Sequence, residues 1–458
     1  MNAMESTNPD LGSRIETDAL GALELPADSL VGIQTRRAVG NFAISGLPIR
    51  QHPDLIRALA MVKRAAATAN LRLGLLDERV GAAIIAACDA VIAGAHHEAF
   101  VVDVFQGGAG TSTNMNMNEV IANLALDRLG APRGSYDIVS PHDHVNRSQS
   151  TNDVYPTAAR LSLLFAHERF AADLSGLAQA FRAKAALFQG VRKLGRTQLQ
   201  DAVAMTVGQE FGAFATALQE DVARSAEIAR LFLEINLGGT AIGTGLNAPP
   251  AYAGIAIAAL SKLSGFEMRA AENLIEASWD MGAFVLFSGM LKRTAVKLSK
   301  IANDLRLLGS GPRGGLGEIR LPALQPGSSM MPGKVNPVLP EVVSQVCFQV
   351  IGNDLAVTLA AEAGQLQLNA MEPLIVHDLH QGLALLSSTM RAFSRLCVEG
   401  IEVDGAKCDE HLNRSLSSAT SLVPLIGYEK AAELAKRALA EGRTIEDLAA
   451  AELGVPSR

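Results

Sequence analysis

A repeating apolar pattern in the middle of the chain restricts the possible fold more than any other feature of the sequence. Between residues 291 and 305, apolar side chains recur at alternating intervals of four and three positions, with lysine and arginine between them. A second set with compatible spacing lies between residues 211 and 232. Such spacing places one apolar stripe along the face of a long helix. The stripes are Leu291, Ala295, Leu298, Ala302 and Leu305, then Phe211, Leu218, Val222, Ala229 and Phe232.

A third helix is predicted from Val342 to Ala361, where the chain is apolar nearly all round. We expect this helix to be buried on several sides, including against other subunits. The aromatic content of 4% also favours helices, because sheets are enriched in aromatic and β-branched residues. The expected fold class is therefore mainly all-α, with a central bundle of long helices, and an ordinary globular helical core is the alternative. The expected domains are residues 1–150, a bundle over 151–398 and a small helical unit over 399–458.

Charge and cysteine content exclude several classes of function. The 458 residues carry a formal net charge of -7, which argues against a nucleic acid or an anionic membrane as partner. The four cysteines form no CxxC pair, so we expect free thiols in a reducing compartment. The N-terminus lacks the apolar stretch of a signal peptide, and the longest charge-free run, 235–261, is too rich in glycine for a membrane helix. These features predict a soluble cytoplasmic protein.

Four polar segments interrupt the apolar chain and concentrate Gly, Ser, Thr and Asn, which prefer turns and helix caps to helix interiors. The fourth segment, GSSMMPGKVNP, contains too few apolar residues for a core strand and cannot form a packed helix. The third opens what we expect to be a helix. The segments are QGGAGTSTNMNMNE (106–119), HVNRSQSTND (144–153), GRTQLQDAV (195–203) and GSSMMPGKVNP (327–337).

These segments supply hydroxyl, amide and backbone N–H donors together with one lysine, Lys334. Such groups bind carboxylates well, so segments that converge in space would bind a small dianion. The alternative for each segment taken alone is an ordinary capping box or tight turn, but four in one chain weaken that alternative.

Other chemistries fit the sequence less well. There is no nucleophile elbow, P-loop or dinucleotide fingerprint. His377 and His380 have the spacing of metal ligands but no accompanying HExxH or carboxylate motif, so we interpret them as a structural pair and expect no metal site. His142 and His144 flank the second segment, where a functional role and a turn-stabilising role remain alternatives.

The segment GSSMMPGKVNP resembles the signature of the aspartase/fumarase superfamily, G-S-S-x-M-P-x-K-x-N-P, and the other polar segments follow in the expected order. The resemblance extends from about residue 14 to about residue 448, and it is closest to the aspartase branch. It implies three mostly helical domains, a homotetramer with a twenty-helix core and active sites shared by three subunits. The implied reaction is the reversible anti elimination of ammonia from L-aspartate to give fumarate.

The resemblance also implies a role for each residue that matches the family motifs. Ser328 matches the general base of a reaction that proceeds through an aci-carboxylate intermediate. The backbone N–H groups of Met330 and Met331 match the donors that support the serine oxyanion. The side-chain carboxylate would be bound by Thr111, Ser150, Thr151 and Ser329. The α-carboxylate would be bound by Thr197, Lys334 and Asn336, and the amino group by Asn152. Lys334 is expected to be buried against the substrate carboxylate that it pairs with.

Gln198 stands where fumarases carry histidine, while aspartases carry either residue, and in the family this position pairs with a glutamate matched here by Glu341. Hydroxide is a poor leaving group and needs a proton donor, whereas the ammonium of aspartate leaves as ammonia without one. We therefore expect Gln198 to be a substrate-binding residue that favours loss of ammonia over loss of water. The chain stops at Arg458, earlier than many relatives, and the small residues Ala204 and Ala370 at usually bulkier positions have no explanation here.

Three hypotheses remain open on the sequence alone. The first is ammonia loss from aspartate. The second is another elimination on the same scaffold, either fumarate hydration or loss of a substituted amine from an N-substituted aspartate. The third is an inactive structural or binding tetramer, which the intact Ser328, Lys334 and Asn336 disfavour. The resemblance implies no required cofactor and leaves activation by a divalent metal such as Mg²⁺ open.

Overall fold

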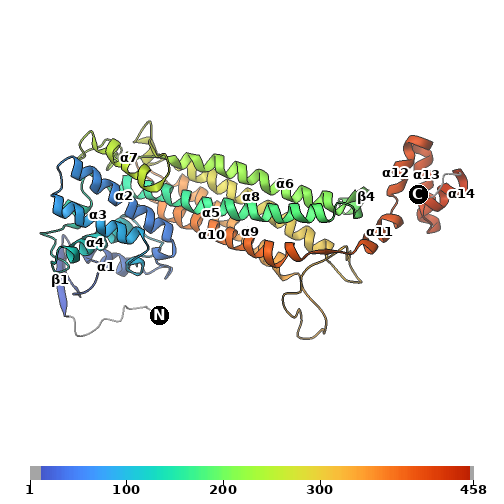
Figure 1. Cartoon of the computed structure of the whole chain (residues 1–458), viewed down its shortest axis with the longest axis horizontal. Helices are drawn as coiled ribbons and strands as arrows, with labels where there is room; N and C mark the ends of the chain where they lie inside the picture. The colour runs from blue at the N-terminus through green and yellow to red at the C-terminus, as the bar shows by residue number, and fades with distance from the viewer. Residues whose placement is uncertain (1–11, 454–458) are drawn as a thin grey trace. The chain divides into compact units, whose positions relative to one another are not determined.

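A computed structural model describes residues 12–453, and helices dominate it (Figure 1). The chain forms two compact units, each built from stretches that are far apart in the sequence. The first unit holds residues 12–170, 224–292 and 350–384, and the second holds residues 171–223, 293–349 and 385–453. The mainly all-α expectation is confirmed, and the division at residues 150 and 398 stays a prediction.

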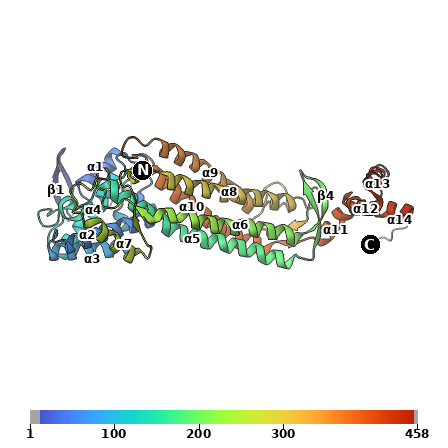
Figure 2. The same ribbon diagram turned by 90° about the horizontal axis from the view of Figure 1, so that it is seen from above.

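Five long helices contribute to both units, because each crosses the boundary between them. They are α5 (Thr151–Leu187), α6 (Val207–Ala229), α8 (Gly282–Leu308), α9 (Val338–Glu362) and α10 (Glu372–Leu396). Helix α8 contains the predicted stripe 291–305, and α6 contains the second stripe as far as Ala229. Helix α9 confirms the helix predicted from Val342 to Ala361. Within each unit, the helix portions run side by side (Figures 1 and 2).

Buried carboxylates join the long helices to one another. In the second unit, Asp221 on α6 is fully buried and accepts hydrogen bonds from Thr294 Oγ1 (3.0 Å) and Lys297 Nζ (2.6 Å) on α8. In the first unit, Asp354 on α9 accepts from Ser288 Oγ (2.8 Å) and Lys292 Nζ (2.5 Å) on α8. Each carboxylate is paired with a cation, which offsets the desolvation of its charge.

Shorter helices complete the first unit, where α2 packs against α3 and α7, and α3 packs against α4 (Figure 1). Fully buried alanines such as Ala58, Ala60 and Ala66 on α2 allow the helix axes to approach closely. Helix α3 begins after Asp77, whose carboxylate accepts from the N–H groups of Arg79 and Val80 and so caps the helix. These helices are α1 (Ile33–Asn41), α2 (Pro53–Arg72), α3 (Glu78–Ile92), α4 (Thr111–Arg128) and α7 (Tyr252–Ser264).

The described strands are short and form four two-stranded sheets. Strands β1 and β2, β3 and β4, and β7 and β8 pair in antiparallel fashion, whereas β5 and β6 pair in parallel. Their bounds are β1 (Ser13–Asp18), β2 (Gly21–Pro26), β3 (Arg192–Thr197), β4 (Gln200–Thr206), β5 (Glu234–Ile235), β6 (Arg269–Ala270), β7 (Ile319–Arg320) and β8 (Glu402–Val403).

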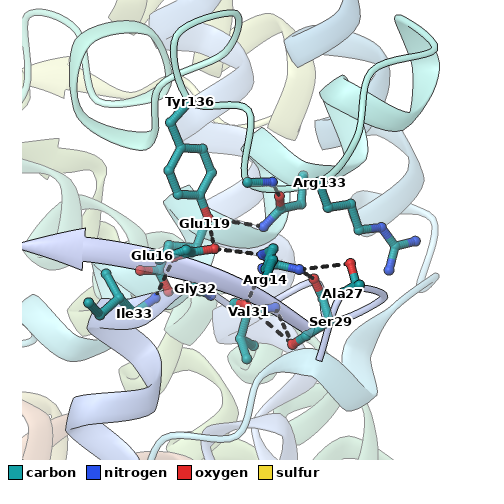
Figure 3. Close-up of polar contacts among 12 residues, drawn as sticks. Arg14, Glu16, Ala27, Ser29, Val31, Gly32, Ile33, Glu119, Arg133 and Tyr136 are labelled. Carbon is teal, nitrogen blue, oxygen red and sulfur yellow. Dashed lines mark hydrogen bonds and ion pairs between the residues drawn. The ribbon is translucent and has the colours of Figure 1, made fainter. Parts of the chain in front are cut away.

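A polar network attaches the β1–β2 hairpin to helix α1 (Figure 3). The Arg14 guanidinium donates to the carbonyls of Ala27 (3.0 Å), Ser29 (2.8 Å) and Val31 (2.9 Å), and to the carboxylate of Glu16 (2.9 Å). These bonds hold the irregular segment after β2 around the Arg14 side chain.

The network extends to helix α4 through Glu119, the last residue of the first polar segment (Figure 3). Its buried carboxylate accepts from the N–H groups of Gly32 (2.9 Å), Gln34 (2.8 Å) and Thr35 (3.1 Å), which lie at the N-terminus of α1. A Cβ on Gly32 would lie 2.7 Å from Glu119 Cδ, so this contact requires glycine. Helix α4, which begins at Thr111, is therefore fixed against α1.

The C-terminal segment is helical, and it belongs to the second unit. It contains α11 (Gly405–Arg414), α12 (Ser417–Ile426), α13 (Tyr428–Glu441) and α14 (Ile445–Leu453). Its core comprises Ala419, Leu434, Ala438, Ile445, Leu448 and Ala449. Helix α11 contacts β3, and α12 contacts β4, so this segment packs on the β3–β4 hairpin.

Helix α9 is less buried than its composition predicts. By length and composition alone it could cross a membrane, and it is the one helix among residues 12–453 that meets that criterion. The exposed side chains of Phe348, Leu355 and Leu359 lie on one face of the helix, and Asp354 lies on the buried side. The isolated chain therefore leaves an apolar surface uncovered, which we call the α9 stripe.

Three buried histidines lie in contact in the first unit. His52 Nε2 is 2.9 Å from His377 Nδ1, the His52 ring stacks on the His380 ring at 5.2 Å, and His380 Nε2 hydrogen-bonds Ser162 Oγ (2.7 Å). Burial and the neighbouring imidazoles lower the pKa of His52 to about 3. Burial, with the Arg169 charge, lowers the pKa of His380 to about 3, and burial also lowers that of His377, although Asp103 opposes it.

We expect this cluster to make the fold acid-sensitive. The imidazoles of the unfolded chain bind protons near pH 6.5, whereas those of the folded cluster do not. The free energy of unfolding therefore falls as the pH drops from about 6.5 toward 3, by about 1.4 kcal/mol per pH unit for each imidazole. His380→Gln, which keeps a partner for Ser162 but cannot titrate, should weaken this dependence. Urea-unfolding midpoints at about pH 7, 5.5 and 4.5, at one protein concentration, measure it. Parallel curves for the variant and the wild type would contradict the assignment.

Candidate active site

The first polar segment places Thr111 at the N-terminus of α4. Gly110 precedes it with φ +88°, and a Cβ there would lie 2.5 Å from the Tyr155 ring, so the close approach to α5 requires glycine. The Thr111 hydroxyl is exposed and donates to the carbonyl of Gly108 (2.7 Å). Asp103 stabilises the preceding turn by accepting from the N–H group of Phe105 (2.8 Å).

The second segment surrounds the N-terminus of α5 and is held by Asp153, which is fully buried. The Asp153 carboxylate accepts from the N–H groups of Ser150 (2.9 Å), Gly238 (2.9 Å) and Thr240 (3.1 Å). The Asn152 side chain donates through Nδ2 to the carbonyl of Ala241 (2.8 Å). Asp153 thus fixes Ser150 and Asn152 against a loop that is distant in the sequence.

The structure brings the first two segments together in the first unit. Asn114 Nδ2 donates to Thr151 Oγ1 (3.0 Å) and also lies 3.2 Å from Asn146 Oδ1. Beneath them, Lys63 is fully buried on α2 and donates to Asn146 Oδ1 (2.9 Å) and Gln149 Oε1 (3.0 Å). Burial lowers the pKa of Lys63 to about 7, although the charge of Asp153 opposes this shift.

Lys63 and Asp153 support this segment and were not predicted from the sequence. The available signal for Lys63 was its place in the run AMVKRAAA, which is apolar apart from Lys63 and Arg64. Asp153 was visible only as the end of the second segment, because its partners Gly238 and Thr240 lie far along the chain.

The prediction that the third segment opens a helix is wrong. Residues 192–206 form the β3–β4 hairpin, and helix α6 begins only at Val207. Thr197 pairs with Gln200, and the turn residues Gln198 and Leu199 have φ values of 55° and 63°. The hairpin exposes Thr197 and Gln198, so both predicted binding residues lie at its tip.

The fourth segment is an irregular loop in the second unit that is closed by its own hydrogen bonds. The N–H group of Gly327 donates to the carbonyl of Lys334 (2.9 Å), and Asn336 Nδ2 donates to the carbonyl of Gly327 (2.7 Å). A Cβ on Gly327 would lie 2.3 Å from that Lys334 oxygen, so the crossing of the two chain segments requires glycine. We call residues 327–337 the signature loop.

Within the signature loop, Ser328 Oγ accepts hydrogen bonds from the backbone N–H groups of Met330 and Met331, both at 3.1 Å. Two donors converge on one hydroxyl oxygen, which is the geometry that stabilises negative charge there. Ser329 and Lys334 are exposed, so the expected burial of Lys334 is not found in the isolated chain. The Asn336 amide, predicted to bind a carboxylate, here holds the loop closed.

The four segments therefore occur as two pairs. Thr111, Ser150, Thr151 and Asn152 belong to the first unit, and the hairpin tip and the signature loop belong to the second. The pairing of Gln198 with Glu341 stays a prediction.

The remaining candidates have structural roles. His144 Nδ1 accepts from the N–H group of Ser140 (2.8 Å), which supports the turn-stabilising interpretation. Among residues 12–453, no group of three or more His, Cys, Asp or Glu side chains is arranged to hold a metal ion. The four cysteines, Cys88, Cys347, Cys397 and Cys408, are buried and form no disulfide, as the sequence predicts.

Comparisons with known proteins match the chain to lyases over most of its length. A lyase family model matches residues 21–352, and a model of the fumarase C C-terminus matches residues 419–457. An aspartate ammonia-lyase from Pseudomonas aeruginosa is 58% identical over 442 residues, which are 96% of this chain and 93% of that protein.

Two solved structures extend the comparison. A fumarate lyase:delta crystallin from Brucella melitensis, crystallised with bound cobalt, is 60% identical with a TM-score of 0.95, covering 97% of this chain and 96% of that one. A class II fumarase from Schistosoma mansoni is 35% identical with a TM-score of 0.92, covering the same shares of the two chains.

Proposed function

Because the chain belongs to the aspartase/fumarase superfamily of lyases, we propose that it is an aspartate ammonia-lyase, which converts L-aspartate reversibly to fumarate and ammonia. The observation that carries the proposal is the geometry of Ser328, whose Oγ accepts from two backbone N–H groups at 3.1 Å. A carbon–nitrogen lyase of this kind needs a base strong enough to remove a proton from carbon. Two aligned donors provide the support that such an oxyanion requires.

The reaction begins with removal of a proton from the carbon next to the side-chain carboxylate. Ser328 Oγ takes this proton, and the electron pair moves into that carboxylate to give a dianionic aci-carboxylate. The pair then returns to form the double bond of fumarate while the C–N bond breaks on the opposite face and ammonia leaves. Since negative charge develops on the side-chain carboxylate, donors directed at it lower the barrier.

The polar residues of the four segments divide between the substrate's charged groups. Thr111, Ser150, Thr151 and Ser329 would donate to the side-chain carboxylate, for which the Thr111 hydroxyl must turn away from the Gly108 carbonyl. Thr197, Lys334 and Asn336 would donate to the α-carboxylate. Asn152 would bind the ammonium through Oδ1, because its Nδ2 already donates to Ala241. Binding through Lys334 and Asn336 requires the signature loop to open from its closed form, and loop movement of this kind is common in enzymes.

Gln198 favours ammonia loss over water loss. It lies at the hairpin tip and can donate a hydrogen bond, but it cannot deliver a proton to a departing hydroxide. Fumarate hydration is the second candidate, because a class II fumarase shares this fold at 35% identity. Loss of a substituted amine from an N-substituted aspartate is a third. None of the proposed steps requires a cofactor, and assays with EDTA and with added Mg²⁺ test metal activation.

We also propose a homotetramer in which three subunits contribute to each active site. The α9 stripe is the support, since Phe348, Leu355 and Leu359 expose an apolar surface to water. A bundle of α9 helices from four copies would bury it. The proposed partners are then small-molecule substrates and further copies of the chain, with no nucleic acid or membrane. The proposed location is the cytoplasm, where unpaired cysteines remain reduced.

The proposed activity predicts that L-aspartate is turned over and L-malate is not. Fumarate absorbance measured in parallel from the two substrates tests this directly, and N-methyl-aspartate tests the third candidate. Dehydration of malate without reaction of aspartate would replace the assignment by a fumarase.

Ser328→Ala should lower kcat for aspartate at least about a hundredfold, on the usual scale for a positioned base, while the oligomer stays intact. Ser421→Ala provides the control, because Ser421 is an exposed helical serine that donates only to the carbonyl of Ser418. Near-normal turnover in soluble Ser328→Ala protein would exclude this residue as the base.

Phe348→Glu combined with Leu355→Glu should dissociate the oligomer, because both charges would lie on the α9 stripe, which the proposed tetramer buries. Sedimentation velocity should show a tetramer for the wild type and smaller species for the variant, with loss of aspartate turnover. Leu439→Glu is the matched control, since Leu439 is an equally exposed leucine on α13. A tetrameric double variant would refute the role given to α9.

A further inference from the structure

The tip of the β3–β4 hairpin is held in a conformation that its sequence does not favour. Gln198 and Leu199 both have positive φ, 55° and 63°, in a two-residue turn. Such turns normally contain Asn-Gly or similar pairs, because side chains beyond Cβ crowd the backbone at positive φ. Strained turns persist where the surrounding structure fixes them, and they concentrate at functional sites.

One buried carboxylate holds the base of this hairpin. Glu318 is 1% exposed, and its Oε1 accepts from Arg196 Nη2 (2.7 Å) on β3. The same oxygen accepts from His411 Nδ1 (2.9 Å) on α11, which therefore carries its proton on Nδ1. Lys193 Nζ lies 3.3 Å from Glu318 Oε2 and 2.6 Å from Glu210 Oε2 on α6. A single residue thus joins β3 to α11, with α6 attached through Lys193.

The backbone around Glu318 is also fixed. Its N–H group donates to the carbonyl of Leu308 (3.0 Å), and its carbonyl accepts from the N–H group of Asp404 (2.9 Å). The next residues, Ile319 and Arg320, pair with β8. Burial raises the pKa of Glu318, but hydrogen bonds from Arg196 and His411 and the charge of Lys193 outweigh it, so the pKa is lowered and the group is an anion.

Arg196 immediately precedes Thr197, and side chains alternate between the two faces of a strand. When Arg196 points toward Glu318, the Thr197 side chain points to the opposite face, where the structure leaves it exposed. The bond to Glu318 therefore determines the direction of the hydroxyl one residue further along and limits the movement of the strained turn.

We propose that Glu318 is a positioning residue for substrate binding: through Arg196 it fixes the strained hairpin tip so that Thr197 can bind the α-carboxylate and Gln198 can contact the substrate, and through His411 it couples that tip to α11. This inference rests on the proposed function for the identity of the ligand. Glu318 does not touch the substrate itself, so its effect is on binding and not on the chemical step.

Glu318→Gln tests the inference because it keeps the shape but removes the charge. KM for aspartate should rise about tenfold, with kcat within about threefold of the wild type, the pattern of lost binding that is equal in ground and transition states. His411→Gln should raise KM less, about threefold, and the double variant should be no worse than Glu318→Gln alone, because the two groups share one bond. Glu402→Gln, in the exposed ion pair with Arg320, should leave KM unchanged.

Hydrogen exchange of the peptide covering residues 195–203 provides a readout that does not depend on activity. Exchange should accelerate in Glu318→Gln and not in Glu402→Gln, because the hairpin opens more often when its base is released. If the wild type does not turn over aspartate but this exchange still accelerates, the proposed function fails and the positioning role stands.

A soluble Glu318→Gln tetramer with wild-type KM and unchanged exchange would overturn the inference while leaving the proposed function intact. A fall in kcat with unaltered KM, so that kcat and kcat/KM decrease by the same factor, would overturn the inference as well, because it indicates an effect on the chemical step. If Glu318→Gln does not fold, the test uses His411→Gln, because His411 is only half-buried. Normal KM and normal exchange at residues 195–203 in this variant would refute the proposed coupling of the hairpin tip to α11.

Discussion

Buried carboxylates that accept backbone N–H groups are the interaction on which this structure depends. Asp153 receives three such bonds at the start of α5, and Glu119 receives three at the start of α1. In each case one side chain satisfies donors that a turn or a helix N-terminus would otherwise leave unpaired away from water. The polar segments can therefore remain irregular, as a binding site requires, without losing a defined shape.

The same arrangement explains how an all-helical scaffold accommodates carboxylate chemistry. The long helices supply rigid positions for their first residues, such as Thr151, while the carboxylates fix the loops that approach those positions. Lys63 adds a cation beneath the second segment, where it donates to Asn146 and Gln149. Asp153 consequently fixes the second segment before substrate arrives, whereas the proposed binding through Lys334 and Asn336 requires the signature loop to open.

Local features of the sequence were the predictable ones. The long helices follow from apolar spacing, and the convergence of Met330 and Met331 on Ser328 involves residues only two and three positions apart. The β3–β4 hairpin was missed because GRTQLQDAV lacks the glycine or asparagine that normally marks a two-residue turn. The contacts of Asp153 with Gly238 and of Glu318 with His411 could not be predicted for another reason, because each joins residues separated by more than eighty positions. The surroundings of Lys334 differ from expectation because a single chain leaves its loop uncovered.

The signature loop has a consequence for changing what such an enzyme accepts. Its closure uses the main chain at Gly327 and Lys334 and the Asn336 amide, and the support of Ser328 comes from the peptide groups of Met330 and Met331. The side chains of Met330, Met331 and Val335 are exposed and take no part in either arrangement. Substitution of these three side chains should therefore leave the two backbone N–H groups on Ser328 Oγ in place, so the exposed surface of the loop can be varied independently of that oxygen's surroundings.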